Sequence, residues 1–279
     1  MDSVPPPPHG KLGIVLPWSS PFMFSLTVDS LLNLRHPHGI ELRHFRSSGW
    51  CPAARHINGC AAAMRWGADL ILILGTDQVY DEDLLCRLVA RWKEGYEVVS
   101  ALVPARGFVG WQQMQPFQPM AWRLKANAPG DLTYRVFGGQ HDTPDLLEAI
   151  DPKAGNMQRI HFIGSGVLLF HRDHLLALKR PWFSEMVDPL SYNRLANMDC
   201  RFVWRLHHEA HAQVWVDTTI KVKHLHVFPI DETYSARFAD WAEPGQGDPT
   251  ICRYAAPHDG PTNGAGASAE SAADEQVRV

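Results

Sequence analysis

The sequence predicts an α/β fold in which a doubly wound sheet is flanked by helices. From residue 11 to residue 104, apolar runs of strand length alternate with segments whose apolar residues recur at helical spacing. The resulting order is strand, helix, strand, helix, strand, helix, strand, which is typical of parallel strands joined by crossover helices. Ligands of such sheets bind beyond the carboxyl ends of the strands, so residues that follow strands are the first site candidates.

The first half of the chain supplies the regular elements of this prediction. Strands are expected where apolar runs stop at Pro, Gly or polar residues, and helices where alanine-rich or amphipathic spacing dominates. Acidic residues at 81–83 suit the N-terminus of the third helix, and Gly95 ends it. The expected strands are 11–16, 40–46, 70–74 and 96–104, and the expected helices are 24–35, 53–67 and 81–94.

The second half of the chain is less regular. Residues 106–158 are rich in Gln and Pro, and the apolar segment after them is interrupted by Gly164-Ser165-Gly166. Here the expected strands are 120–125, 133–137, the two halves of 160–170, and 213–216, with helices at 172–178 and 198–208.

Composition indicates one domain between two irregular ends. Residues 1–10 contain a proline run, and residues 242–279 are rich in Gly, Ala, Ser and Pro with few large apolar side chains, so both are expected to be disordered. The ordered domain is expected to span 11–241. Five cysteines, an odd number without a CxxC pair, predict reduced thiols rather than disulfides.

Charge and hydropathy exclude some classes of partner. The formal net charge of −4 gives no general attraction to nucleic acid. No apolar run is long enough to cross a bilayer, and the N-terminus lacks the pattern of a secretory signal. We therefore expect a soluble protein without a membrane partner, located in the cytoplasm, or in the host cytoplasm if it is phage-encoded.

Two carboxylates are candidates for chemistry. Asp77 follows a buried strand in ILILGTDQV, where it can ligate a divalent cation that neutralises a diphosphate; the alternative is a loop residue that caps the next helix. Asp199 lies at the start of a helix in NMDCRFVWRL, where it can take a proton from a hydroxyl. Its alternative role is that of a helix N-cap.

Histidines near the end of the domain are candidate metal ligands. His224 and His226 alternate in VKHLHVF, so an extended backbone presents both on one face. One of them can complete a metal site begun by Asp77, and the pair can alternatively hold zinc with a third ligand. With 15 histidines in the chain, each is by itself also compatible with an ordinary surface or core role.

The remaining candidates are binding residues. Gly164-Ser165-Gly166 allows a ligand to approach the backbone closely, although such turns also arise for steric reasons. Arg55 and Arg106 can offer charge to phosphates or be ordinary surface residues. We assign Pro17, after the first strand, and Gln78, beside Asp77, to the donor side as well. The aromatic segment that begins at Trp111 is expected to shape the acceptor side.

Taken in order, the segments ARHINGCAAAMRWGADLILILGTDQV, IHFIGSGVLLFHRDHL and NMDCRFVWRLHHEAHAQVWVDTTIKVKH resemble successive blocks of GT-A glycosyltransferases, especially the family-2-like inverting enzymes of bacteria and phages. The resemblance covers about residues 11–228. It implies a Rossmann-like nucleotide-diphospho-sugar transferase domain that moves a sugar from a UDP- or GDP-sugar to an acceptor hydroxyl, with Mn²⁺ or Mg²⁺ as the cofactor.

The resemblance also implies roles for single residues. Asp77 matches the final Asp of the family's DxD motif, which binds the metal and the diphosphate. Asp199 matches the Asp of a Glu-Asp pair, the general base. His224 matches a second metal ligand, and Arg55 matches an arginine on the nucleotide side. The residues 164–166 match the loop beside the donor sugar and the acceptor.

Two departures from the family pattern leave alternatives open. Gly75 stands where the first Asp of the DxD motif is expected, and Met198 stands in place of the Glu of the Glu-Asp pair. A catalytically degenerate module that only binds nucleotide sugars is one alternative. A nucleotidyltransferase is disfavoured because the loop after the first strand, LPWSSPF, is neither basic nor glycine-rich. The acceptor can be a protein, a glycan, a small molecule or, for a phage enzyme, a hydroxymethylated DNA base.

Overall fold

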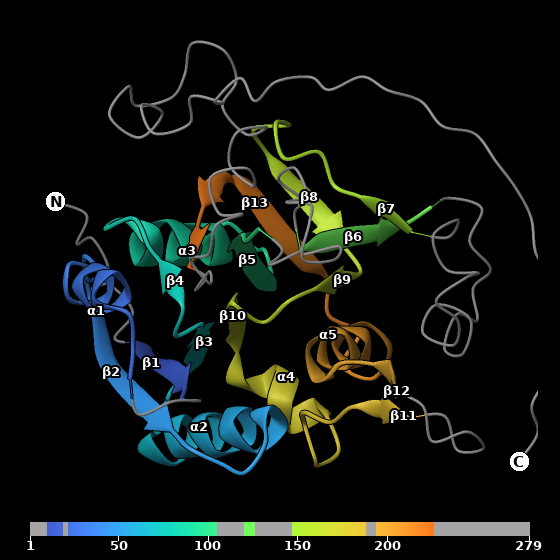
Figure 1. Ribbon diagram of the computed structural model, residues 1–279, viewed down its shortest axis with the longest axis horizontal. Coiled ribbons are helices and arrows are strands. Elements are labelled where there is room, and N and C mark those ends of the chain that lie inside the picture. The colour runs from blue at the N-terminus through green and yellow to red at the C-terminus, as the bar shows by residue number, and fades with distance from the viewer. Residues whose placement is uncertain (1–9, 19–21, 105–119, 126–146, 188–193, 226–279) are drawn as a thin grey trace, which may run out of the picture. The chain divides into compact units, whose positions relative to one another are not determined.

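A computed structural model describes residues 10–18, 22–104, 120–125, 147–187 and 194–225 (Figure 1). Several expectations lie outside this part of the chain. They are the disordered segments 1–10 (apart from Gly10) and 242–279, the strand at 133–137, and the candidate site residues Arg106, Trp111 and His226.

A seven-stranded sheet forms the centre of the described region, in the order β2-β1-β3-β10-β5-β13-β8. Its neighbours β2, β1 and β3 are parallel, as are β5 and β13. The bounds are β1 (Gly10–Pro17), β2 (Ile40–Ser47), β3 (Leu70–Leu74), β5 (Val98–Leu102), β8 (Met157–Ile160), β10 (Val167–His171) and β13 (Val214–Lys221).

The four strands expected between residues 11 and 104 all run in the same direction, as predicted, but the sheet as a whole is mixed because strands of the second half join it. Strand β10 runs antiparallel to both of its neighbours and separates β3 from β5, and β8 is antiparallel at one edge. The second half of the expected segment 160–170 is therefore a central strand. It was not distinguishable from an edge strand by its sequence because a short apolar run is compatible with either place.

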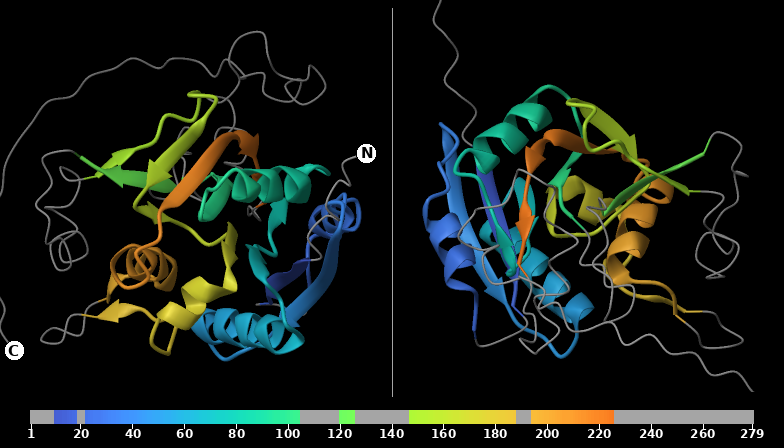
Figure 2. Two further views of the ribbon diagram at one scale, coloured as in Figure 1. Left: turned by 180° about the vertical axis from the view of Figure 1, so that it is seen from behind. Right: turned by 45° about the horizontal axis from the view of Figure 1, so that its top comes forward.

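Helices cover both faces of the sheet (Figures 1 and 2). Alternate residues of β3 divide between two cores: Ile71 and Ile73 pack on one face, and Leu70, Leu72 and Leu74 pack on the other. Helices α2 (Pro52–Trp66), α4 (Arg172–Ala177) and α5 (Met198–His208) contribute to the first core, and α3 (Leu84–Lys93) contributes to the second. The predicted α/β class with a helix-flanked sheet is confirmed.

Most predicted helix boundaries agree with the structure within a few residues, but α3 starts late. It begins at Leu84 rather than at residue 81, because Asp81 forms a turn in which its carbonyl accepts a hydrogen bond from the Leu84 N–H. Asp83 is the N-cap without a side-chain capping bond, and its carboxylate lies 4.0 Å from the Arg87 guanidinium. The other helix of this half, α1 (Ser25–Leu32), lies within its predicted range.

The remaining short strands form three small sheets that are separate from the central one. The expected strand at 120–125 is β6, which pairs antiparallel with β7 and β9 in a separate three-stranded sheet. Two further pairs, β4 with β14 and β11 with β12, are also antiparallel. The bounds are β4 (Gln78–Val79), β6 (Ala121–Leu124), β7 (Leu147–Ala149), β9 (Phe162–Ile163), β11 (Met186–Val187), β12 (Arg194–Ala196) and β14 (Lys223–His224).

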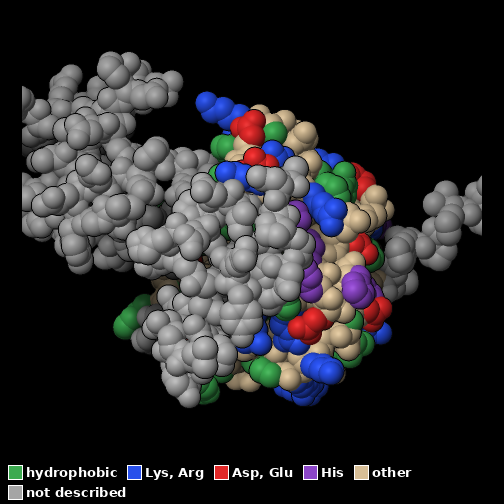
Figure 3. All heavy atoms as spheres, turned by 90° about the vertical axis from the view of Figure 1, so that its right-hand side faces the viewer, with side chains coloured by type: hydrophobic (Ala, Val, Ile, Leu, Met, Phe, Trp, Pro, Cys, Tyr) green, Lys and Arg blue, Asp and Glu red, His purple; other side chains and the backbone are tan. Residues whose placement is uncertain are grey.

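Two surface properties bear on possible partners. No helix in the described part of the chain is both long and apolar enough to span a membrane. On the face turned to the viewer in Figure 3, acidic and basic side chains are interspersed with histidines where the surface is uncovered. Mixed charge of this kind differs from the single-sign patch by which proteins commonly attract nucleic acid.

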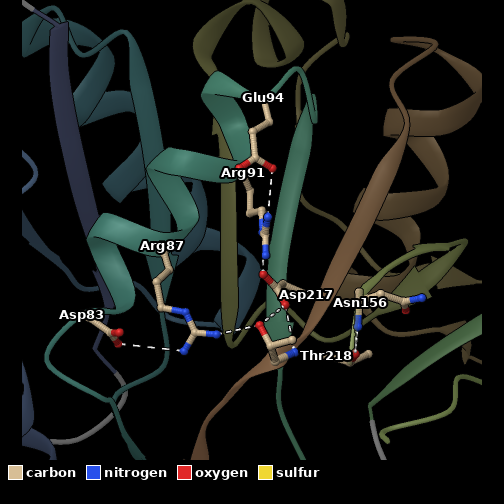
Figure 4. A network of polar contacts seen from close by, with 8 residues as sticks. Asp83, Arg87, Arg91, Glu94, Asn156, Asp217 and Thr218 are labelled. Carbon is tan, nitrogen blue, oxygen red and sulfur yellow. Dashed lines mark hydrogen bonds and ion pairs between the residues drawn. The ribbon is translucent and has the colours of Figure 1, made fainter. Parts of the chain in front are cut away.

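A buried carboxylate joins α3 to β13 (Figure 4). Asp217 is fully buried, and one of its oxygens accepts a hydrogen bond from Arg91 Nε at 2.7 Å. The other oxygen accepts bonds from the backbone N–H and the hydroxyl of Thr219. Burial alone would raise the pKa of Asp217, but the hydrogen bonds from Thr219 and Arg91 outweigh burial and lower it. The ionised carboxylate therefore stabilises the folded state.

We expect Asp217→Asn to lower the free energy of unfolding by roughly 1–3 kcal/mol at about pH 7, because the amide cannot satisfy the same donors. Since the folded-state pKa is depressed, this stabilisation is present above the unfolded-state pKa and is lost as the pH falls through the folded-state value. Urea denaturation at neutral and acidic pH measures the difference, which should shrink at acidic pH. Exposed Asp29→Asn is the control, and a difference independent of pH would contradict this assignment.

Candidate active site

Residues that follow several parallel strands of the central sheet lie together at the edge where those strands end. The parallel strands β1, β3, β5 and β13 all end there. Because β10 is antiparallel to β3 and pairs Val167 with Leu74, the loop 164–166 before β10 lies beside the turn 75–77 after β3. The backbone N–H of Gly75 donates to the Gly166 carbonyl at 2.7 Å, which fixes the two segments to each other.

A cavity of about 360 Å³ opens at this edge. Its volume lies within the range of small-molecule sites in proteins. Eight separate segments of the chain line it, and their residues are separated by up to about two hundred positions in the sequence. The lining residues are Pro17, His56, Gly75, Thr76, Asp77, Gln78, Val103, Met120, Gly164, Ser165, Gly166, Met198, Asp199 and His224.

Asp77 and His224 form one side of the cavity. Pairing of β4 with β14 sets Gln78 opposite His224, and the Leu225 N–H donates to the Asp77 carbonyl at 2.8 Å. The Nδ1 of His224 lies 2.9 Å from the Pro104 carbonyl, which can only accept, so Nδ1 carries the proton. The buried Nε2 has no hydrogen-bond partner among the described residues and lies 3.5 Å from Asp77 Oδ1.

The side chain of Gln78 fills the space between two glycines. It is 2% exposed, and a Cβ on Gly166 would lie 2.1 Å from its Nε2. A Cβ on Gly75 would lie 2.9 Å from the same amide and 3.2 Å from Asp77 Oδ1. The buried hydroxyl of Tyr80 donates to the Gly75 carbonyl at 2.6 Å. Burial, reinforced by the charge of Asp77, holds the pKa of Tyr80 well above its usual value, so this donor keeps its proton.

Asp199 forms the other side of the cavity with two buried partners. It lies in the first turn of α5, where Asn197 is the N-cap and accepts a bond from the Cys200 N–H. The alternative in which Asp199 is merely the cap is therefore wrong. Its Oδ1 accepts a 2.6 Å hydrogen bond from Ser165 Oγ, which in turn lies 3.0 Å from His56 Nε2. The hydroxyl of Ser165, in the loop 164–166, therefore holds the Asp199 carboxylate in place at the cavity.

The structure brings most of the sequence-predicted site residues together. Those that line the cavity are Pro17, Asp77, Gln78, Gly164, Ser165, Gly166, Asp199 and His224. Arg55 is not among the lining residues; its Nε donates to the Gly49 carbonyl at 3.1 Å. Arg106, Trp111 and His226 lie outside the described residues.

Thr76, Val103, Met120 and His56 line the cavity without having been predicted from the sequence, and His56 is the titratable group among them. It is 6% exposed and lies on the buried face of α2 with Gly59, Cys60 and Ala63. That spacing of i, i+3, i+4 and i+7 marks a core-facing stripe, on which a histidine needs polar partners. The sequence signal for His56 is its place on this stripe, whereas the neighbouring Arg55 carries the charge that suits phosphate binding.

We expect Gly166→Ala to lower the free energy of unfolding by roughly 1–3 kcal/mol, since the new methyl group collides with a buried side chain. Removing that side chain should relieve the collision, so Gly166→Ala should cost less in a Gln78→Ala background than in the wild type. Urea denaturation of the double-mutant cycle measures the coupling. In the control Gly10→Ala a Cβ meets nothing within 4 Å. Equal costs of Gly166→Ala in both backgrounds would refute the role of Gln78.

Comparisons with known proteins concern the fold. No protein-family model and no curated protein matches the sequence. Solved structures that match include A197 from STIV, with 14% identity, a TM-score of 0.44, and coverage of 81% of this chain and 100% of that chain. GalNAc-T7 with UDP, GalNAc and Mn²⁺ matches with 8% identity, a TM-score of 0.46, and coverage of 81% of this chain and 45% of that chain.

Proposed function

We propose that this chain is a GT-A-type glycosyltransferase that moves a sugar from a nucleoside-diphosphate donor to an acceptor hydroxyl with inversion. The observation that carries the proposal is the meeting of Asp77, Asp199 and His224 in one cavity. These residues come from three separate segments of the chain, and the resemblance assigned them to the metal, the base and the second metal ligand. Their common cavity is what a single transfer reaction requires.

The position of the cavity supports a nucleotide ligand. It lies beyond the carboxyl ends of parallel strands β1, β3 and β5, where open α/β sheets bind their ligands. Pro17, the last residue of β1, and Gln78, which follows β3, line the same cavity and are assigned to the donor. We assign the donor to the UDP- or GDP-sugars, and the acceptor to a hydroxyl on a protein, glycan, small molecule or modified DNA base.

The residues on one side of the cavity fit a divalent cation. The buried Nε2 of His224 presents a lone pair toward a carboxylate oxygen of Asp77, an arrangement that a proton or a cation between them would stabilise. No group of three or more His, Cys, Asp and Glu ligands occurs among the described residues. Two protein ligands suit Mg²⁺ or Mn²⁺, which in nucleotide sites commonly take their other ligands from phosphates and water.

Asp77 and His224 would hold this ion, which when bound would neutralise the charge that develops on the departing diphosphate. On the other side, Asp199 would accept the proton of the attacking hydroxyl. Inversion requires the attacking hydroxyl and the departing diphosphate to lie on opposite faces of the sugar. The loop 164–166 and Gln78, which line the cavity together with both groups, would position the sugar for this attack.

A second candidate is a module that binds nucleotide sugars without transferring them. Its specific support is Met198, an apolar residue that lines the cavity next to Asp199 where the resembling enzymes have Glu. The two candidates share the donor site and differ in turnover. Asp199→Asn separates them, because it should abolish the sugar transfer of an enzyme, whereas a binding module has no transfer to lose and should bind nucleotide as before.

We expect UDP or GDP to bind in the presence of Mn²⁺, and binding to weaken by about tenfold or more in Asp77→Asn, because a ligand of the metal-diphosphate is lost. Calorimetric titration with Mn²⁺ and then with EDTA measures both effects. Exposed Asp29→Asn makes the same chemical change away from the cavity and should bind as the wild type does. Failure of both nucleotides to bind with Mn²⁺ would rule out transferase and binding module alike.

A further inference from the structure

Behind Asp199, two side chains continue a hydrogen-bonded chain into the protein. Asp199 Oδ1 lies 2.6 Å from Ser165 Oγ, Ser165 Oγ lies 3.0 Å from His56 Nε2, and His56 Nδ1 lies 2.8 Å from the Pro52 carbonyl. Each step has hydrogen-bonding distance, and the three side chains come from α5, the loop before β10, and α2. All three side chains line the cavity, and the chain of bonds ends at the backbone of α2.

The number of protons in this chain is constrained by its geometry. The Pro52 carbonyl can only accept, so the proton of a neutral His56 is on Nδ1 and Nε2 offers a lone pair. Ser165 has one hydroxyl hydrogen, which can serve Asp199 or His56 but not both. All three contacts are satisfied only when the group holds one further proton, either on His56 Nε2 or on the carboxyl group of Asp199.

The surroundings of His56 favour a ring that is neutral at rest and able to accept a proton. Burial lowers its pKa, whereas the charge of Asp199 and the bond to Pro52 act in the opposite direction. Arg55, one residue away on α2, opposes protonation, and the Phe183 ring lies against the imidazole with 5.0 Å between centroids. Protonation of the ring is thus stabilised by an ionised Asp199 reached through Ser165.

We propose that Asp199, Ser165 and His56 form a proton relay in which the acceptor's proton moves from the Asp199 carboxylate through Ser165 to His56 Nε2. The O–H bond of the acceptor breaks as its oxygen attacks the sugar, and the proton passes to Asp199. Ser165 then gives its own proton to His56 Nε2 and takes the proton from Asp199. The product state holds an ionised Asp199 and a protonated His56, so every proton is accounted for.

This inference rests on the proposed function, because the relay needs a proton released at Asp199. The relay gives Asp199 its negative charge back within the same turnover, before the product leaves. Asp199 is the catalytic residue in this scheme, and Ser165 and His56 act through it. A purely structural role would need only the hydrogen bonds, which a glutamine at position 56 can reproduce in part without being able to take up a proton.

The first test follows the protonation of His56 directly by long-range ¹H–¹⁵N spectra of the histidine rings, recorded from about pH 8 downwards. The His56→Gln spectrum assigns the signals. The wild-type ring should begin as the Nδ1-protonated tautomer and take its second proton on Nε2. In Ser165→Ala and Asp199→Asn we expect its proton affinity to fall about tenfold, a shift of one pH unit. The ring of His44, on β2, should titrate unchanged in all proteins.

A His56 that titrates identically in the three proteins, or that stays neutral until the wild type unfolds, would overturn the relay. Thermal melting of each variant establishes that it is folded. Asp199→Asn preserves the size of the side chain and carries the test if Ser165→Ala fails to fold.

The second test separates the relay from the proposed function. Release of nucleoside diphosphate is measured from UDP- and GDP-sugars with water as the acceptor. We expect His56→Gln to lower kcat by about tenfold or more with an unchanged KM, since only proton transfer is affected. His44→Gln should match the wild type. Wild-type kcat in His56→Gln would overturn the relay and leave the transferase standing, whereas absent nucleotide binding in the wild type would overturn the transferase itself.

Discussion

The close approach of two backbone segments, at Gly75 and Gly166, is the constraint on which the candidate site depends. A 2.7 Å hydrogen bond joins these glycines, and the amide of Gln78 occupies the volume that a Cβ on either one would need. Asp77 is thereby held on one side of the contact and Ser165, the partner of Asp199, on the other. If either glycine carried a side chain, Gln78 would have to move, and it is too buried to do so freely. The same crowding gives a physical reason for glycine rather than aspartate at position 75.

The antiparallel placement of β10 makes this contact possible. A parallel strand next to β3 would have entered the sheet from the opposite edge, and the loop before it would have been a strand length away from Asp77. With β10 reversed, its first residue lies opposite the last residue of β3, and the loop 164–166 is delivered to the edge where the parallel strands end. Strand direction, rather than any single interaction, therefore decides that the loop 164–166 and the turn 75–77 share a cavity.

Much of this arrangement could be predicted from the sequence, and the failures have identifiable causes. The buried strands and amphipathic helices of the first half were predictable because their periodicity is local, and Asp77 was predictable because it directly follows such a strand. The direction of β10 depends on pairing with residues about a hundred positions away, which apolar composition does not encode. His56 was missed because a histidine on a helix stripe has meaning only when its partner, Ser165, is known, and that partner is 109 residues away.

The two sides of the cavity differ in the polar groups that they bring together. His224 Nε2 lies 3.5 Å from Asp77 Oδ1, so positive charge placed between them would be stabilised by the carboxylate. Asp199, Ser165 and His56 lack one proton of the number that would satisfy all their contacts. In the proposed function a cation would lie on the first side, and the second side would take up a proton. The proposed transfer reaction involves both sides. Negative charge would develop on the departing diphosphate beside Asp77 and His224, where the cation would lie. The proton of the attacking hydroxyl would be released beside Asp199, Ser165 and His56, which can take it up.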